Sequence, residues 1–256
     1  MKIVIPMSGL GQRFVDAGYS PIKPLIPVLG KPIIEWVLTL FPGQDDFLFI
    51  CRDEHLQSTP LQDELMRLKP NAKIVGIKGH KKGPVYAVTK ALDEIDDKEQ
   101  VLVSYCDYYM QWNYPEFLRK VTDGNYDGAI PCYTGFHPHL LPEKNLYASC
   151  DVDDEQCLIE IREKHSFTKD KTKSLHSPGM YYFKSGEILK KYCQLMLEKD
   201  IHLNGEYYVS LVYNLMVQDS LKVWAPSNVP HFCQWGTPED LEAFLFWASA
   251  VKGAAK

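Results

Sequence analysis

Short apolar runs and amphipathic segments alternate along the first half of the chain. The apolar runs are expected to form strands at residues 2–7, 46–51, 73–77 and 100–105. The amphipathic segments predict helices at residues 32–41, 53–68 and 84–96. Because strands that alternate with helices pair in parallel through right-handed crossovers, this pattern predicts an α/β fold with a mostly parallel sheet flanked by helices.

The second half of the chain carries several short apolar runs separated by turns such as Asp153–Glu155. Strands are expected at residues 127–133, 146–152, 157–163, 178–184, 221–225 and 231–235. Helices are expected at residues 185–198, at 205–219, and from Pro238 to about Val251. Strands joined by short turns favour antiparallel pairing, so the sheet is expected to be mixed. Residues 1–256 are interpreted as one domain, with a core large enough to need no disulfides.

Composition narrows the class of protein. The chain is 45% hydrophobic and 24% charged, which is typical of a globular protein, and its net charge of -5 argues against a non-specific nucleic-acid binder. No apolar run reaches the length of a membrane span, and the first residues are expected to form a strand and not a signal peptide. The seven cysteines form no C-x-x-C pair. We therefore expect a cytoplasmic protein with free thiols and no membrane partner.

A loop rich in small residues follows the first predicted strand. Gly9 and Gly11 allow the backbone to come close to a phosphate, and Arg13 presents a planar guanidinium that pairs with phosphate oxygens. Lys23, held between two prolines, adds a second cation. The pattern is neither a P-loop nor G-x-G-x-x-G. It indicates a triphosphate loop or, equally, a strand-to-helix turn with solvated charges.

Three further positions carry candidate chemistry. Asp107 directly follows a buried predicted strand, where Mg²⁺ would be a natural partner; the alternative is an N-cap for the segment after Trp112. Lys164 ends a later predicted strand and is either a second phosphate ligand or an ordinary surface lysine. Residues 78–83 (KGHKKG) bring cations and glycines to the start of a helix, which favours anions, or form a solvated basic turn.

The loops at 8–13, 78–83 and 106–109 each follow a predicted parallel strand. Because ligands bind at the carboxyl ends of the strands in an open α/β sheet, we expect these three loops to share one site. The chain has no G-x-S-x-G or H-E-x-x-H pattern that would indicate a nucleophilic serine or a catalytic zinc.

Taken together, these motifs resemble the sugar-phosphate nucleotidyltransferase (NDP-sugar pyrophosphorylase) family over about residues 1–245. The opening motif of that family is roughly G-x-G-x-R-[LF], followed by two K-P pairs. The chain carries the family's motifs in the family's order, at Gly9–Phe14, Lys23-Pro24, Lys31-Pro32, Gly83, Asp107, Glu163-Lys164, Gly179–Phe183, Gly205–Tyr208 and Trp235–Asp240.

The resemblance implies a Rossmann-like fold of the GT-A type, with a nucleotide-binding half at about 1–125 and an acceptor-binding half at about 126–256. The implied reaction joins a nucleoside triphosphate to a phosphorylated small molecule and releases pyrophosphate, with Mg²⁺. The implied catalytic residues are Arg13, Lys23, Asp107 and Lys164. The implied nucleotide-binding residues are Met7, Ser8, Gly9, Leu10, Gly11, Gln12, Lys23, Gly83, Pro84 and Cys106. The implied acceptor-binding residues are Lys164, Gly179, Glu206 and Tyr207, and the implied metal ligands are Asp107 and Gln234.

Two departures from the family pattern affect specificity. Gln234 stands where relatives often carry a second metal-binding aspartate, and an amide oxygen brings less charge. Pro6, Met7 and Gln12 also differ from the usual opening motif. This variant resembles nucleotidyltransferases of capsule or surface-polysaccharide pathways, some of which use CTP and acceptors that are not hexoses. CTP is therefore favoured weakly over UTP and dTTP.

Other functions stay open beside this interpretation. One is a cytidylyltransferase that acts on a non-sugar phosphate. A glycosyltransferase of the same fold would normally carry D-x-D, whereas Tyr108 and Tyr109 follow Asp107. A non-catalytic nucleotide- or sugar-binding regulatory module tends to lose the loop cations, which this chain retains as Arg13 and Lys23. A homo-oligomer is compatible with each of these functions.

Overall fold

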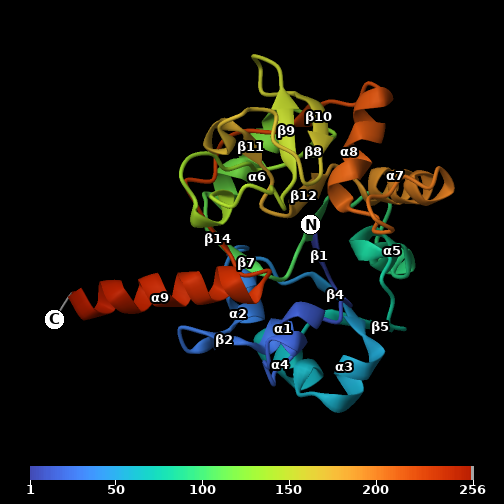
Figure 1. Ribbon diagram of the computed structural model, residues 1–256. Coiled ribbons are helices and arrows are strands. Elements are labelled where there is room, and N and C mark those ends of the chain that lie inside the picture. The colour runs from blue at the N-terminus through green and yellow to red at the C-terminus, as the bar shows by residue number, and fades with distance from the viewer. Residues whose placement is uncertain (255–256) are drawn as a thin grey trace.

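The computed structural model of the protein describes residues 1–254 (Figure 1). A seven-stranded sheet runs through its centre, built from β1 (Lys2–Met7), β4 (Phe47–Arg52), β5 (Lys73–Ile77), β6 (Val101–Ser104), β8 (Gly128–Ala129), β12 (Met180–Phe183) and β13 (Val223–Trp224). Their order in space is β13-β8-β12-β6-β1-β4-β5. Only β12 is antiparallel to its neighbours, which confirms the predicted mixed, mostly parallel sheet.

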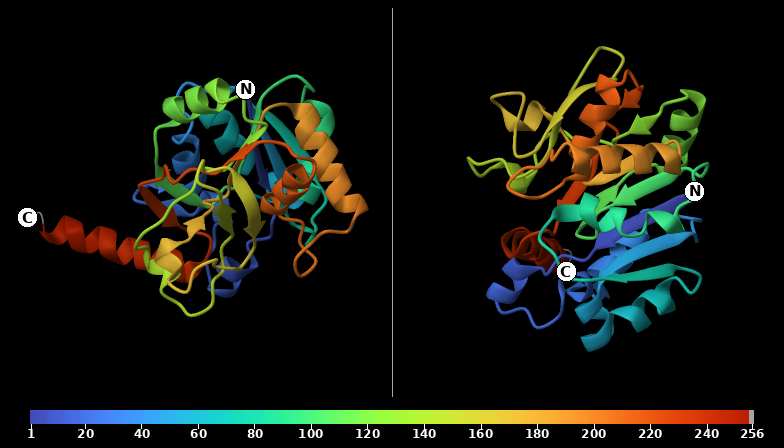
Figure 2. Two further views of the ribbon diagram at one scale, coloured as in Figure 1. Left: turned by 90° about the horizontal axis from the view of Figure 1, so that it is seen from above. Right: turned by 90° about the vertical axis from the view of Figure 1, so that its right-hand side faces the viewer.

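Helices cover both faces of this sheet (Figure 2). Successive side chains of a strand point to opposite faces. Accordingly, Ile3 and Ile5 join one core and Val4 joins the other. The first core is completed by α2 (Ile33–Leu38), α4 (Leu61–Leu68) and α6 (Tyr114–Asp123). The second core is completed by α5 (Gly83–Thr89), α7 (Gly186–Glu198) and α8 (Val209–Gln218).

Smaller sheets flank the central one. The antiparallel pairing expected in the second half is present in the sheet β10-β9-β11, formed by β9 (Ser149–Val152), β10 (Leu158–Arg162) and β11 (Leu175–His176). A two-stranded ribbon pairs β7 (Tyr108–Gln111) with β14 (His231–Gln234). The remaining pair is β2 (Pro27–Val28) with β3 (Lys31–Pro32).

Several predicted helices differ in extent from the observed ones. The helix expected at 53–68 is two helices, α3 (Asp53–Ser58) and α4, because Pro60 lies between them and proline has no N–H to continue a helix. The helix expected at 84–96 ends at Thr89, and a 3₁₀ turn, η2 (Leu92–Glu94), follows it. The helix expected at 205–219 begins only at Val209, so residues 205–208 form a loop.

The expected loops and strands also need correction. The loop at 8–13 ends early, because its last two residues begin α1 (Gln12–Asp16). The loop at 106–109 ends in β7, which the sequence did not predict. The strands expected at 127–133 and 146–152 are reduced to β8 and β9. Helix α6 is capped by Asn113, whose Oδ1 accepts the Glu116 N–H at 3.1 Å, so the cap considered for Asp107 is wrong.

Helix α9 (Pro238–Ala254) begins beside the ribbon and then runs outward, away from the body of the molecule (Figures 1 and 2). Its first half is attached: Phe244 packs edge-on against Trp235, and Tyr19 Oη donates to Glu242 at 3.4 Å. Further along the helix, Phe246 and Trp247 are 64% and 60% exposed. Among residues 1–254, no helix combines the length and hydropathy that a membrane crossing requires.

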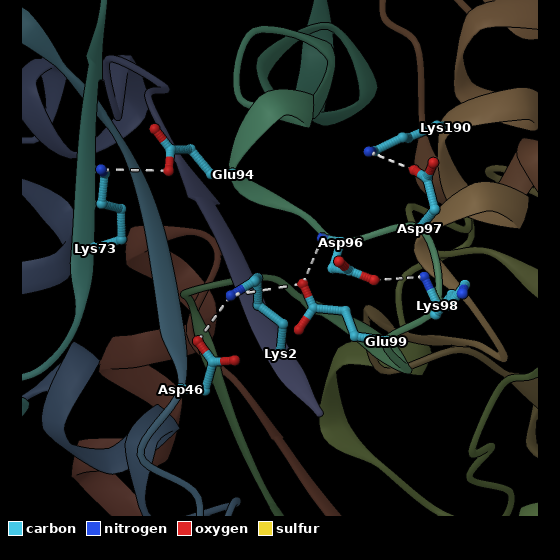
Figure 3. A network of polar contacts seen from close by, with 9 residues as sticks. All are labelled: Lys2, Asp46, Lys73, Glu94, Asp96, Asp97, Lys98, Glu99 and Lys190. Atoms are coloured by element: carbon cyan, nitrogen blue, oxygen red, sulfur yellow. Dashed lines mark hydrogen bonds and ion pairs between the residues drawn. The ribbon is translucent and has the colours of Figure 1, made fainter.

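Charged side chains gather at the amino end of the central strands, opposite the glycine loop (Figure 3). Lys2 Nζ lies 2.8 Å from Asp46 and 3.6 Å from Glu99, and Lys190 Nζ lies 2.6 Å from Asp97. These ion pairs tie the acidic segment after η2 to β1 and α7. The charged side chains at this end of the sheet therefore pair with one another and connect neighbouring elements of the fold.

Candidate active site

The three loops expected to share a site follow β1, β5 and β6, and these strands lie close together in the order β5-β4-β1-β6. Because the strands are parallel, their carboxyl ends meet at one edge of the sheet. The loops at 8–13, 78–83 and 106–109 consequently begin at the same edge, as the sequence predicted.

The glycine loop is shaped around Lys23. Met7 and Ser8 are buried at the end of β1, whereas Gly9 and Leu10 are exposed. Gly11 has a φ of 69°, in the left-handed region that favours glycine, and a Cβ added there would stand 3.3 Å from the Cβ of Lys23. The close approach of these two residues explains why a glycine precedes α1.

The first turn of α1 carries the two polar side chains predicted for this loop. Gln12 Nε2 donates to Asp16 Oδ1 at 2.6 Å, within the helix itself. Arg13 is exposed and lies within electrostatic range of both Lys23 and Tyr208. Arg13 therefore presents its charge from the exposed first turn of α1.

Lys23 and Asp107 form an ion pair at the centre of the site. Lys23 begins the 3₁₀ turn η1 (Lys23–Leu25), and its Nζ donates to Asp107 Oδ2 at 2.5 Å. The two side chains are only 20% and 21% exposed. Burial alone would lower the pKa of the Lys23 ammonium, but the charge of the Asp107 carboxylate and its hydrogen bond to Nζ offset this and the pKa is raised. The lysine therefore stays charged at neutral pH.

Gln234 and Asp107 meet around Gly236. A Cβ added to Gly236 would stand 2.7 Å from Gln234 Nε2 and 3.1 Å from Asp107 Oδ2. The β7–β14 ribbon creates this proximity, because it pairs Gln234 with Tyr108 next to the aspartate. No cluster of three or more His, Cys, Asp or Glu side chains within residues 1–254 could hold a metal. One carboxylate and one amide nevertheless fit Mg²⁺, which takes few protein ligands together with substrate phosphates.

Cys106 is half-buried, directly precedes Asp107 in the chain and lies near Lys23. Burial, with a further contribution from the Asp107 charge, raises the pKa of its thiol to about 12. The group is thus a neutral thiol at physiological pH and is not an activated nucleophile. Its place in the site is that of a small apolar wall.

The start of α5 is joined to the predicted acceptor region by main-chain hydrogen bonds. The Tyr207 N–H donates to Lys82 O at 2.9 Å, and the Val85 N–H donates to Tyr207 O at 3.0 Å. Gly83 has a φ of 80°, and a Cβ added there would stand 2.8 Å from Tyr207 N and 3.2 Å from the Cβ of Glu206. We call this contact the 83–207 seam. It places Gly83 and Pro84, predicted for the nucleotide, directly against Glu206 and Tyr207.

Lys164 lies on the same side of the site as the seam. It has a φ of 54°, and its Nζ stands 5.7 Å from the centre of the Tyr208 ring. The adjacent Glu163 accepts a hydrogen bond from Ser210 Oγ. Burial, with a smaller contribution from Glu206, raises the pKa of the Glu163 carboxyl to about 7. The Lys164 ammonium and a carboxyl group that titrates near neutrality therefore belong to adjacent residues.

Gly179 supports this region from the position just before β12. Its φ is 95°, its carbonyl accepts the Tyr105 N–H at 2.9 Å, and an added Cβ would stand 2.7 Å from the Tyr105 ring. Tyr105 Oη in turn accepts the Val209 N–H at 3.3 Å. The glycine thus leaves room for the ring that packs against the start of α8.

Sequence reasoning missed two polar pairs at the site. His80 Nε2 lies 3.1 Å from Ser8 Oγ, joining the loop after β5 to the loop after β1. Tyr147 Oη donates to Asp240 Oδ2 at 3.1 Å, and Thr237 Oγ1 donates to the same oxygen at 2.9 Å. The signal for Asp240 was its place in the last family motif. His80 was visible only as one member of a basic turn.

The site combines cations with a single carboxylate at the carboxyl edge of an α/β sheet. Such a site suits a protein that positions nucleoside phosphates and neutralises their charge, without a side-chain nucleophile. This is the class of nucleotidyltransferases. Residues 3–168 match the MobA-like NTP transferase domain family, and the chain belongs to this family. It is therefore a nucleotidyltransferase enzyme.

Solved structures share the fold over nearly the whole chain. A nucleoside-diphosphate-sugar pyrophosphorylase from Vibrio cholerae RC9 superposes with a TM-score of 0.75 at 21% identity, covering 95% of this chain and 99% of that one. A Bacillus anthracis protein described as a glucose-1-phosphate thymidylyltransferase, in complex with sucrose, has a TM-score of 0.74 at 16% identity, covering 97% and 95%. No curated protein sequence matches the chain. The two likenesses confirm the Rossmann-like α/β fold.

Proposed function

We propose that the enzyme joins a nucleoside triphosphate to a phosphorylated sugar or sugar-like small molecule and releases pyrophosphate, with CTP favoured over UTP and dTTP. The observation that carries the proposal is the ion pair of Lys23 Nζ with Asp107 Oδ2, 2.5 Å apart and next to Gly11. A binding module needs no such pair, because a bound nucleotide can be held by backbone groups and one cation.

The proposed reaction needs no general base. An ionised oxygen of the acceptor phosphate attacks the α-phosphorus, and a new P–O bond forms as the bond from that phosphorus to the β-phosphate oxygen breaks. The bonding electron pair leaves with pyrophosphate. Catalysis then depends on in-line positioning and on neutralising charge, as in other phosphoryl transfers.

The residues have distinct roles in this scheme. Backbone groups of the loop from Ser8 to Gly11 approach the triphosphate, and Arg13 and Lys23 neutralise its charge and that of the leaving pyrophosphate. Gly83 and Pro84, with Met7 and Cys106, bound the nucleotide. Lys164 holds the acceptor phosphate, while the remainder of the acceptor contacts residues around Gly179, Glu206 and Tyr207.

Mg²⁺ is part of the proposal. Asp107 and Gln234 would hold the ion together with phosphate oxygens, since their side chains converge on Gly236. When bound, Mg²⁺ lowers the charge repulsion around the transferred phosphorus. Lys23 remains beside Asp107 to orient its carboxylate.

The biological setting follows from the unusual opening motif. Pro6, Met7 and Gln12 support a role in capsule or surface-polysaccharide precursor synthesis. The substrates would be small phosphorylated molecules in the cytoplasm, with no nucleic acid or membrane partner. Both halves of the chain would act within one catalytic unit, which could also assemble with its own copies.

One observation favours a second acceptor class, a phosphorylated compound that is not a sugar. Two carboxyl groups, those of Glu163 and Glu206, are close to the Tyr208 ring, which Lys164 approaches from 5.7 Å. Carboxylates beside an aromatic ring suit an ammonium group, and Lys164 suits a phosphate. A phosphorylated amino alcohol would satisfy both.

A pyrophosphate-release screen tests these proposals. Four nucleoside triphosphates are crossed with hexose 1-phosphates, pentose and polyol phosphates and phosphorylated amino alcohols, in the presence of Mg²⁺ and, as a control, of a chelator. We expect release with CTP and one acceptor class, lost on chelation. Release with no pair at all would instead favour a regulatory binding module.

A further inference from the structure

His80 connects two segments of the site that are far apart in sequence. Its Nε2 lies 3.1 Å from Ser8 Oγ at the end of β1, and its Nδ1 accepts the Lys82 N–H at 3.1 Å. The ring also packs edge-on against Tyr86 of α5, with ring centres 4.7 Å apart. The imidazole is thus held on three sides, by β1, by its own loop and by α5.

These contacts decide which nitrogen of His80 carries the hydrogen. Nδ1 must present its lone pair to the Lys82 N–H, so in the neutral ring the hydrogen is on Nε2. Nε2 therefore donates to Ser8 Oγ. The Ser8 hydroxyl uses its oxygen as an acceptor and keeps its own hydrogen free to donate. Ser8 is only 3% exposed, and within residues 1–254 its Oγ has no other hydrogen-bond partner.

The charges around His80 favour the neutral ring. Burial, first, and then the positive charges of Arg52, Lys82 and Lys90 lower the pKa of the imidazole below its usual value. Arg52 ends β4, and the two lysines belong to the start and the end of α5. No carboxylate faces the ring among the groups that act on it.

The two ends of the glycine loop face different partners. Gly11 abuts Lys23, whose ammonium pairs with the Asp107 carboxylate, and this is the side assigned to the phosphates. Ser8 abuts His80 and, through it, the start of α5, where Gly83 and Pro84 are proposed to bound the nucleotide; this is the side we assign to the nucleobase. A hydroxyl hydrogen available on the base side needs an acceptor on the ligand.

We propose that His80 is a positioning residue that fixes the Ser8 hydroxyl as a donor to a carbonyl oxygen on the edge of the nucleobase. This inference rests on the proposed function, because it assumes that a nucleotide binds at this edge of the sheet. Cytosine, uracil, thymine and guanine carry such an oxygen, and adenine does not. The pair therefore disfavours ATP, since adenine carries an amino group where guanine carries its oxygen and offers only ring nitrogens, at other positions, as acceptors.

Nucleotide binding without an acceptor provides the test. Titration calorimetry with the four nucleoside triphosphates and Mg²⁺ compares the wild type with Ser8→Ala, His80→Phe and the double variant. Ser249→Ala, an exposed serine of α9, is the matched control. We expect the wild type to bind CTP about tenfold more tightly than ATP, and each single variant to lose most of that preference. The double variant should lose no more than either, because the two residues act as one unit.

The pH dependence separates positioning from simple packing. Protonation of His80 removes the Nδ1 lone pair, so CTP affinity of the wild type should fall as the pH is lowered through the titration of His80, whose pKa lies below the usual histidine value. His80→Phe, which keeps the ring on Tyr86 but cannot titrate, should show no such fall. Retention of the full CTP preference in Ser8→Ala, or of the pH profile in His80→Phe, would overturn the inference. If the wild type prefers CTP and the variants lose that preference as expected, but no acceptor gives pyrophosphate release, only the proposed function is contradicted.

Discussion

Lys23 Nζ lies 2.5 Å from Asp107 Oδ2, although 84 positions separate the two residues in the chain. The contact joins the turn after the glycine loop to the carboxyl end of β6. It also gives the half-buried carboxylate a cationic partner, without which its burial would be costly. The pair is therefore a structural link between two loops of the site as well as the centre of the proposed chemistry.

Lys23→Met should lower turnover by at least about 100-fold while the protein stays folded, because the charge that stabilises the triphosphate is lost. Asp107→Asn should have a similar effect through the proposed metal site. Pyrophosphate release measures turnover, and circular dichroism shows whether each variant is folded. Lys120→Met, which removes an exposed lysine of α6 paired with Glu116, is the control. Near-normal release from Lys23→Met would remove that residue from the mechanism.

Gln234→Asp should reduce by several-fold the Mg²⁺ concentration needed for half-maximal rate, because a second carboxylate binds the ion more strongly than an amide. The measurement is a Mg²⁺ titration at fixed substrate concentrations. Gln111→Asp is the matched control, since Gln111 occupies the opposite end of the same β7–β14 ribbon. An equal response in both variants would show that Gln234 is not a ligand.

Gly83→Ala should destabilise the protein by about 1–3 kcal/mol and raise KM for both substrates. The φ of 80° is strained for alanine, and the added Cβ would press on the backbone of Tyr207. Gly18→Ala separates these causes, because Gly18 has a φ of 82° and open space around its Cβ position. Chemical unfolding and steady-state kinetics should show a clearly larger loss for Gly83→Ala. Equal losses would mean that the 83–207 seam contributes nothing.

Glu163→Gln should stabilise the protein increasingly as the pH rises. The pKa of Glu163 is raised by burial from about 4.5 to about 7, so the folded state binds the proton more tightly than the unfolded state. That contribution to stability is present at low pH and is lost as the pH rises through 7. The variant, which cannot ionise, should therefore gain about 1–3 kcal/mol on the wild type between pH 5 and pH 8.

Urea unfolding at the two pH values measures this gain. Glu198→Gln, which changes an exposed glutamate at the end of α7, is the control and should show no such gain. A constant difference between Glu163→Gln and the wild type at both pH values would contradict the placement of the Glu163 carboxyl.

Much of the fold could be predicted because apolar runs bounded by turn residues fix short strands. The bounds expected for β1 and β5 are the observed ones. Strand β7 could not be predicted in the same way, because its four residues become a strand only through pairing with β14, far along the chain. Pro60 was visible as a helix breaker, yet the amphipathic pattern continues across it from α3 into α4.

The same distinction applies to the candidate site: some of its residues could be predicted from local sequence and others could not. Gly11, Lys23 and Asp107 could be singled out because residue type and local context restrict what each can do. The hydrogen bond between Ser8 and His80 joins positions 72 apart, and that between Tyr147 and Asp240 joins positions 93 apart. No local sequence pattern predicts either hydrogen bond, because only the folded sheet brings the segments together.

The 83–207 seam consists of main-chain hydrogen bonds at Lys82, Val85 and Tyr207. Backbone groups are the same in every residue except proline, so the contact does not depend on which side chains residues 206 and 207 carry. Only the glycine at position 83 is tied to it. Residues 206 and 207, the proposed acceptor contacts, can therefore be substituted while the backbone against Gly83, the proposed nucleotide wall, stays the same. Under the proposed function, such a scaffold could evolve new products from one nucleotide donor.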